Sequence, residues 1–212
     1  MANTRSASRR LLRELDGWRK EQLADSPDDD NSPNRGIERL GPAGEGDDLF
    51  RWEAVVNGKG VGGGYDDGRW LLQIDVPATY PLQPPAVRFM TPILHANVHP
   101  TTGAVCLDLL QASAWTPAMG VAACVRAVRL LLGAPGADSP LNIDLAALLR
   151  AGDTDAAARL VRLWCVEQRY EGASQQRTER LNQYGADRGA RCRNVGPGSW
   201  VLGPASWVVA YG

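Results

Sequence analysis

The chain has 212 residues, of which 44% are hydrophobic and 22% are charged, and this size and apolar content suit one substantial core. A formal net charge of -1 excludes the global basic field that would favour nucleic acid or an anionic membrane as a partner. No apolar run approaches the roughly 18 residues of a transmembrane helix, so we expect no direct membrane span.

Four cysteines are spread along the chain without a Cys-x-x-Cys pair, and the N-terminus lacks the apolar segment of a signal peptide. This usage favours a reducing, cytoplasmic setting with free thiols. The two histidines and the cysteine that follows them do not supply the four ligands of a usual zinc site, so we expect no metal.

Apolar residues recur at helical spacing near the N-terminus, at Leu11, Leu12, Leu15 and Trp18, and basic residues occupy the positions between them. Ser6 is a suitable N-cap. The pattern predicts an amphipathic helix that starts at Ser6 and has a basic outer face, which by itself is typical of an ordinary solvated surface.

Residues 25–35 hold three consecutive aspartates and two prolines, which predicts an acidic loop. Stretches rich in β-branched and aromatic residues then predict four strands, at 37–40, 49–56, 69–76 and 86–90. The glycine-rich connection 57–68 is typical of a hairpin. Together these segments favour a four-stranded antiparallel meander, and the prolines of residues 80–85 predict a rigid turn before its last strand.

Apolar residues at intervals of three and four predict helices after the strands, at 121–132, at 144–150 and after a cap at Asp153 or Thr154. The last helix has an apolar stripe of Ala157, Leu160, Val161 and Trp164. The expected fold is an α+β core domain over residues 1–170. Residues 171–212 are polar and then rich in glycine and proline, which predicts a poorly ordered C-terminal extension.

Residues 95–106 combine both histidines, a Thr-Gly pair and Cys106 in one polar loop. Such a loop can present a thiolate at a surface, which makes Cys106 a candidate nucleophile. A buried, inert thiol is the alternative. Cys124 and Cys165 occupy apolar positions of predicted helices, so we expect both to be packing residues.

Five short motifs follow one another in a fixed order. They are Tyr80-Pro81…Pro84-Pro85, His95-x-Asn97, Gly103-x-x-Cys106-Leu107-Asp108, Trp115-Thr116-Pro117-Ala118 and Asp138-Ser139-Pro140-Leu141. In this order they resemble the ubiquitin-conjugating enzymes, over roughly residues 6–170. The resemblance implies the ubiquitin-conjugating fold and an enzyme that carries ubiquitin as a cysteine thioester and transfers it to a protein acceptor.

Segments 47–56, 139–146 and 150–153 resemble the branch of this family that serves peroxisomal import. That branch implies a membrane-anchored peroxisomal partner and recruitment of a cytoplasmic enzyme to the peroxisomal (glycosomal) membrane surface. It also implies the import receptor as the acceptor, modified on a cysteine.

The resemblance assigns roles in the loop residue by residue. Cys106 is the thioester carrier, and it needs no dedicated base because thiols are intrinsically nucleophilic. Asn97 either donates to the tetrahedral oxyanion or pins the loop, and both roles can hold. Structural support falls to His95, Asp108 and Trp115.

The acceptor channel implied by the resemblance contains His99, Asp138 and Ser139. Many family members have an aspartate where this chain has Ser139, so lysine deprotonation through that carboxylate is in doubt. A cysteine acceptor, with an ordinary pKa about two units below that of lysine, would need less help. A second departure is Ala96, which stands where the family has proline and predicts a looser turn.

The resemblance also implies partner surfaces. The surface for the activating enzyme consists of Arg9, Arg10 and Arg13 on the first helix. The surface for a RING-type ligase consists of Leu82, Pro117 and Ala118. The activating enzyme uses the ATP of the pathway, so we expect no cofactor in this chain.

Three alternatives remain open from the sequence. The modifier could be a ubiquitin-like protein, or the chain could be a non-catalytic ubiquitin-binding adaptor, although such relatives lack the cysteine. A cysteine hydrolase is disfavoured, because no nucleophile motif surrounds Cys106 and no carboxylate evidently orients either histidine.

Overall fold

The computed structural model describes residues 2–24, 32–44, 48–106, 114–136 and 140–172. By their contacts, Met1–Tyr170 and Glu171–Gly212 form two units, and all but the first two residues of the second lie outside the described ranges. Most of the predicted acidic loop and of the predicted C-terminal extension is also outside them, so both stay predictions.

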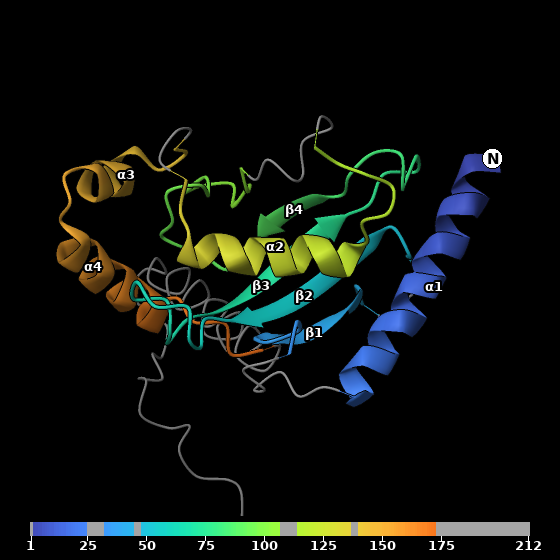
Figure 1. Cartoon of the computed structure of the whole chain (residues 1–212), viewed down its shortest axis with the longest axis horizontal. Helices are drawn as coiled ribbons and strands as arrows, with labels where there is room; N and C mark the ends of the chain where they lie inside the picture. The colour runs from blue at the N-terminus through green and yellow to red at the C-terminus, as the bar shows by residue number, and fades with distance from the viewer. Residues whose placement is uncertain (1, 25–31, 45–47, 107–113, 137–139, 173–212) are drawn as a thin grey trace, which may run out of the picture. The chain divides into compact units, whose positions relative to one another are not determined.

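The first unit is an α+β fold. Its elements are α1 (Ala2–Ala24), β1 (Ile37–Pro42), β2 (Arg51–Asn57), β3 (Arg69–Asp75), β4 (Ala86–Phe89), α2 (Val121–Gly133), α3 (Ile143–Arg150) and α4 (Thr154–Glu167). The strands pair antiparallel in the order β1-β2-β3-β4, which confirms the predicted meander. In Figure 1, α2 crosses one face of the sheet, while α1 and the α3–α4 pair flank opposite ends.

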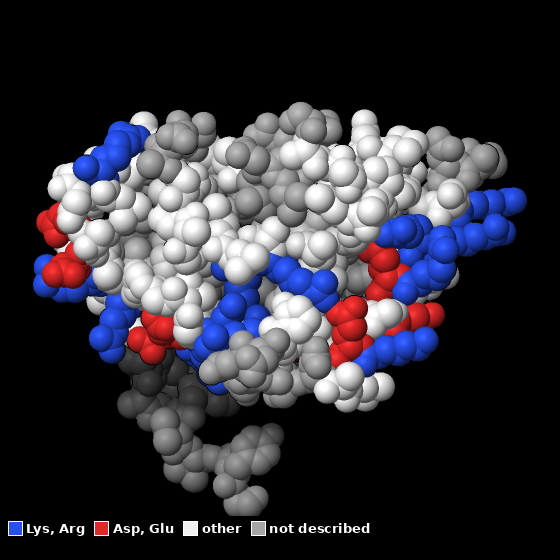
Figure 2. All heavy atoms as spheres, viewed as in Figure 1, with Lys and Arg blue, Asp and Glu red and all other residues white. Residues whose placement is uncertain are grey.

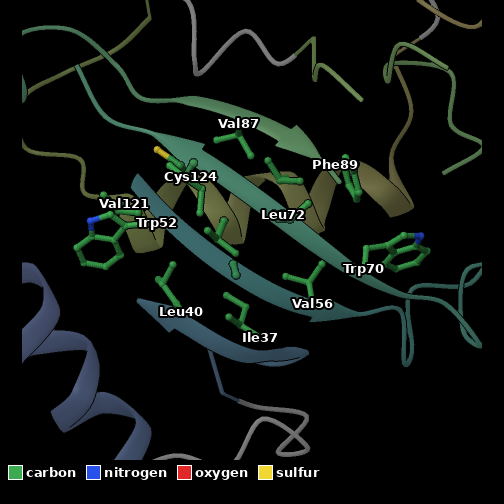
Figure 3. Packing of buried hydrophobic residues seen from close by; sticks show 14 of the residues in the cluster. Ile37, Leu40, Trp52, Val56, Trp70, Leu72, Val87, Phe89, Val121 and Cys124 are labelled. Carbon is green, nitrogen blue, oxygen red and sulfur yellow. The ribbon is translucent and has the colours of Figure 1, made fainter. Parts of the chain in front are cut away.

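The core fills the space between the sheet and α2 (Figure 3). Alternate side chains of β3, from Trp70 through Leu72 to Ile74, are buried, as the period of a half-buried strand requires. Val121 and Cys124 face them from α2. The prediction that Cys124 is a packing residue is therefore confirmed, and burial raises the pKa of its thiol to about 12.

Several sequence predictions were wrong in detail. Helix α1 begins at Ala2, so Ser6 lies inside it, because nothing in the first residues breaks a helix that buries Ala7. On α4, Leu160 and Trp164 are exposed, and the buried stripe is the narrower Ala157, Val161 and Cys165. The spacing of apolar residues along a helix shows which side of the helix faces the core, but not how much of that side the neighbouring elements cover.

The strands differ from prediction by at most two residues at each end. Strand β1 runs on to Pro42, which pairs with Trp52. Because β1 is an edge strand, the missing N–H of a proline leaves no ladder bond unmade.

Glu14 joins α1 to the start of α2. Its carboxylate accepts hydrogen bonds from Arg10 Nε at 2.6 Å, from the Tyr80 hydroxyl at 2.7 Å and from the Val121 N–H at 2.8 Å. The residue before Val121 is Gly120, which offers no side chain as a cap. A carboxylate from another helix thus satisfies a free N–H at the N-terminus of α2 and also interacts with the helix dipole.

His95 holds the opposite end of α2. The ring is fully buried, its Nδ1 accepts from the Asn97 N–H at 3.0 Å, and its Nε2 lies 3.1 Å from the Leu131 carbonyl. These partners require the neutral tautomer with hydrogen on Nε2. Burial lowers the pKa of His95 to about 4, against the opposing effect of the Leu131 hydrogen bond.

Among the described residues, no helix combines the length and the apolar character needed to cross a bilayer.

Replacing Glu14 tests the link between α1 and α2. The substitution Glu14→Ala leaves the buried Tyr80 hydroxyl and the Val121 N–H without their acceptor, so we expect the free energy of unfolding to fall by about 2 kcal/mol. Urea denaturation followed by circular dichroism measures it. The matched control is Asp16→Ala on the exposed face of the same helix, which should change stability by less than about 0.5 kcal/mol; equal losses would contradict the role of Glu14.

The His95 environment predicts a pH dependence. In the unfolded state His95 has its ordinary pKa of 6.5, whereas in the folded state its pKa is about 4. The free energy of unfolding therefore falls as the pH drops from about 6.5 to about 4, because the unfolded state binds a proton that the folded state does not. From pH 7 to pH 5 we expect His95 to remove about 2 kcal/mol from the free energy of unfolding. The difference between the natural chain and His95→Gln, measured by denaturation at both pH values, isolates this contribution. An unchanged difference would refute the prediction.

Candidate active site

The cysteine loop is held as a short antiparallel pair. Val98 and Val105 form a β-bridge, and the Cys106 N–H donates to the Asn97 carbonyl at 2.9 Å. The His99 N–H likewise donates to the Ala104 carbonyl at 2.9 Å. Cys106 therefore lies directly across from Asn97, in a position fixed by backbone hydrogen bonds.

Gly103 allows the tight turn of this pair to lie on β4. Its φ of 68° is in the left-handed region, and a Cβ there would clash with the Phe89 carbonyl. The Phe89 N–H in turn donates to the Gly103 carbonyl at 2.8 Å. The sheet thus supports the segment that delivers Cys106.

The Asn97 side chain is buried and bound to the segment after α2. Its Nδ2 donates to the Gly136 carbonyl at 2.9 Å, and its Oδ1 accepts from the Gly136 N–H at 2.8 Å. A side-chain amide paired with both groups of one residue fixes the two loops against each other. Nδ2 carries a second hydrogen, for which the described residues supply no acceptor.

The neighbouring backbone completes this junction. The Ala96 carbonyl accepts from the Leu141 N–H at 2.7 Å and from the Asn142 N–H at 3.0 Å. Asn142 is also the N-cap of α3 and accepts from the Leu145 N–H. These contacts are independent of the Ala96 side chain, so the turn is held although the resemblance expects proline there.

Cys106 differs from the other described cysteines in exposure. It is partly exposed, whereas Cys124 and Cys165 are buried. Burial also raises the pKa of the Cys165 thiol to about 12. Both buried thiols are therefore poor nucleophiles, and Cys106 is the accessible thiol in the described part of the chain.

His99 and Trp115 both make local bonds. His99 Nδ1 accepts from the N–H groups of Thr101 and Thr102 at 3.2 Å each, which stabilises the turn before Gly103. Trp115 is buried and donates from Nε1 to the Pro81 carbonyl at 2.7 Å.

The Trp115 bond holds the loop after residue 114 beside the proline-rich turn, whose Tyr80–Pro81 peptide bond is cis. Leu82, Pro117 and Ala118 are all exposed on these two segments.

The predicted basic face of α1 is only partly free. Arg9 and Arg13 are exposed, while Arg10 is half-buried and bound to Glu14 and to the Met119 carbonyl. The bonds raise the pKa of Arg10, chiefly through Glu14. Figure 2 shows basic side chains gathered over α1 at one end of the molecule and a second group beside α2.

Three of the predicted site residues, Asp108, Asp138 and Ser139, lie outside the described residues. Sequence reasoning in turn missed Glu14 and Gly136, which fix α2 and Asn97. The residue before Val121 has no side chain that could cap α2, and this could have indicated that an acidic side chain from another part of the chain serves as the cap.

Within the described ranges, no group of three or more His, Cys, Asp or Glu side chains is arranged to hold a metal ion.

Comparison with known proteins agrees with this architecture. The family model described as ubiquitin-conjugating enzyme matches residues 18–164. Ubiquitin-conjugating enzyme E2 PEX4 of Gibberella zeae is 56% identical over 173 residues, which cover 81% of this chain and 94% of that protein. Protein PEROXIN-4 of Arabidopsis thaliana is 47% identical over 105 residues, covering 50% of this chain and 66% of that protein.

A solved structure shares the fold. It is the crystal structure of the H. polymorpha ubiquitin-conjugating enzyme Pex4p in complex with the soluble domain of Pex22p. The TM-score is 0.69 at 34% sequence identity, and the match covers 78% of this chain and 100% of that one.

The family model spans residues 18–164, which is more than half of the chain and includes the loop that contains Cys106, and two of the similar relatives are named as peroxin-4. The name of the Gibberella zeae relative specifies ubiquitin as the modifier, which favours the main interpretation over an adaptor or a ubiquitin-like system. The chain therefore belongs to the ubiquitin-conjugating enzyme family, in its peroxin-4 branch.

Proposed function

We propose that Cys106 is the residue on which this enzyme carries ubiquitin. The observation that carries the proposal is its partial exposure opposite Asn97, in a loop fixed from both sides. As a family member the enzyme acts with ubiquitin and the activating enzyme. We propose that it needs no cofactor of its own, because ATP is consumed upstream.

The chemistry is two acyl transfers at sulfur. The Cys106 thiolate attacks the thioester carbonyl of ubiquitin on the activating enzyme, a new carbon–sulfur bond forms, and the activating enzyme's thiolate leaves. An acceptor nucleophile then attacks the same carbonyl and expels the Cys106 thiolate. Neither step needs a general base on Cys106 itself, which is consistent with a loop where both nitrogens of His95 and Nδ1 of His99 are engaged by backbone groups.

Asn97 is proposed to stabilise the tetrahedral oxyanion with the second hydrogen of Nδ2. Its bonds to Gly136 orient the amide before reaction, which is the condition under which such a donor is effective. His95, in contrast, is buried and neutral, and its proposed role is support of the turn.

The acceptor side stays a proposal based on resemblance. His99 lies in the cysteine loop with Nδ1 bound to the turn, so Nε2 is the nitrogen that could meet an incoming nucleophile. Asp138 and Ser139 would complete the channel. A cysteine of the import receptor is the acceptor class that we propose.

Two surfaces are proposed for the other pathway proteins. Exposed Arg9 and Arg13 would meet the activating enzyme, while Arg10 supports α1 through Glu14. The exposed Leu82, Pro117 and Ala118 would meet a RING-type ligase.

A membrane-anchored peroxisomal partner is proposed from the H. polymorpha relative, which was solved with the soluble domain of Pex22p. Helix α4 of this chain exposes large apolar side chains that such a protein could cover, namely Leu160, Leu163, Trp164 and Val166. Recruitment of this kind would bring the enzyme to the peroxisomal membrane surface.

The substitution Cys106→Ala tests the carrier assignment. Incubation with activating enzyme, ATP and ubiquitin should give a reductant-sensitive adduct with the natural chain and none with Cys106→Ala, because the sulfur of the thioester is gone. Cys106→Ser should give an adduct that resists reductant, since its ester is an oxygen ester. The matched control is Cys192→Ala, at the fourth cysteine of the chain, which lies in the predicted C-terminal extension, and it should keep the adduct. An adduct that survives Cys106→Ala would refute the assignment.

The substitution Asn97→Asp separates the two roles of Asn97. A carboxylate still accepts from the Gly136 N–H but donates nothing, so we expect thioester discharge to slow by about 100-fold. Hydrogen exchange of the Gly136 amide should stay close to that of the natural chain. If discharge is unchanged, or slows only together with loss of that protection, Asn97 acts by pinning the loop alone.

A further inference from the structure

The connection between β2 and β3 places a tyrosine beside the turn that contains Asn97. Tyr65 is buried, and its hydroxyl donates to the Leu94 carbonyl at 3.0 Å. Its ring packs against the ring of His95, with 5.6 Å between the ring centroids and 48° between the planes. Tyr65 thus contacts the two residues that lead into the turn, although it comes from a distant part of the sequence.

The hydrogen bond to Leu94 serves a segment that has no regular backbone pairing. Residues 92–95 belong to no helix or strand, so a carbonyl there depends on side chains or water for its hydrogen bonds. Burial raises the pKa of Tyr65, so the hydroxyl keeps the proton that it donates to this carbonyl. The bond therefore ties the segment before the turn to the connection between β2 and β3.

The ring contact supports the orientation of His95. Its Nδ1 lies 3.0 Å from the Asn97 nitrogen and its Nε2 lies 3.1 Å from the Leu131 carbonyl, and rotation of the ring would break both bonds. An aromatic ring packed against the imidazole opposes that rotation. The position of the Asn97 N–H therefore depends on a ring that Tyr65 supports.

Tyr65 is itself held in place by the turn around it. Its N–H donates to the Gly62 carbonyl at 3.0 Å, and its carbonyl accepts from the Gly68 N–H at 2.8 Å. Gly64 has a φ of 91°, and a Cβ there would clash with the Ala158 carbonyl of α4. In Figure 1 the connection between β2 and β3 runs beside α4. The Tyr65 ring is thus presented by a turn that is fixed by its own hydrogen bonds and by close packing on α4.

We propose that Tyr65 is a positioning residue for the transfer of ubiquitin from Cys106. By holding Leu94 and His95, it fixes the backbone that carries the Asn97 amide. Tyr65 acts through this backbone and makes no contact with the reacting atoms. The inference rests on the proposed roles of Cys106 and Asn97, and it adds a residue on which the second of these roles depends.

The substitution Tyr65→Phe tests the proposal, because it removes the hydroxyl and keeps the ring. We expect the preformed Cys106 thioester to discharge to free cysteine about tenfold more slowly, since a small misplacement of a catalytic group causes a loss of this order. The loss of the reductant-sensitive adduct over time measures the rate.

The matched control is Tyr80→Phe, which removes the hydroxyl of another buried tyrosine from its 2.7 Å bond to Glu14. This bond lies at the other end of α2, so the control should discharge at the natural rate. Equal slowing by Tyr65→Phe and Tyr80→Phe would overturn the proposal, because a general loss of stability would then explain both.

A double variant shows whether Tyr65 acts through Asn97. In a chain that already has Asn97→Asp, the further change Tyr65→Phe should slow discharge much less than it does in the natural chain, because the donor that Tyr65 positions is gone. A full tenfold slowing in that background would contradict the proposal.

Hydrogen exchange gives a readout that needs no thioester. The Asn97 and Gly136 amides should exchange about tenfold faster in Tyr65→Phe and at the natural rate in Tyr80→Phe. If the natural chain forms no adduct on Cys106, or if Asn97→Asp leaves discharge unchanged, it is the proposed function that fails. The exchange comparison still decides whether Tyr65 fixes the turn, and equal exchange in the two tyrosine variants would overturn the inference.

Discussion

The turn of residues 95–97 is buried although nearly all of its groups are polar, and the site depends on this constraint. A buried polar group must find partners, since leaving one unpaired costs on the order of 1–3 kcal/mol. His95 finds them in Leu131 and the Asn97 N–H, and the Asn97 amide finds them in Gly136. The same bonds that satisfy the turn therefore fix the end of α2 and the segment beyond it around the cysteine loop.

This arrangement suits a carrier better than a hydrolase. A hydrolytic cysteine requires a histidine that moves a proton to and from sulfur. Here the ring of His95 is buried and bound at both nitrogens, and His99 Nδ1 holds a turn. A thioester carrier needs accessible sulfur, and Cys106 is partly exposed across from Asn97, whose side-chain amide is fixed by Gly136.

The sequence predicted the elements because their signals are local. Alternation in β3 and the spacing of Val121, Cys124 and Val128 in α2 each follow from one face being buried. The errors arose where distant residues decide the outcome. The exposure of Trp164 depends on what packs against α4, and the cap of α2 comes from Glu14, 107 residues away from Val121. Likewise, motif resemblance identified Asn97 and Cys106, but no spacing rule pointed to Gly136.

Helix α2 connects these features, because each of its ends is completed by another part of the chain. Glu14 satisfies its first N–H and His95 donates to a carbonyl of its last turn, so α1 and the cysteine loop are bound to one rigid element. The outer side of that element carries Arg126 and Arg129, which are bound to the turn before β1 and to the connection after β2.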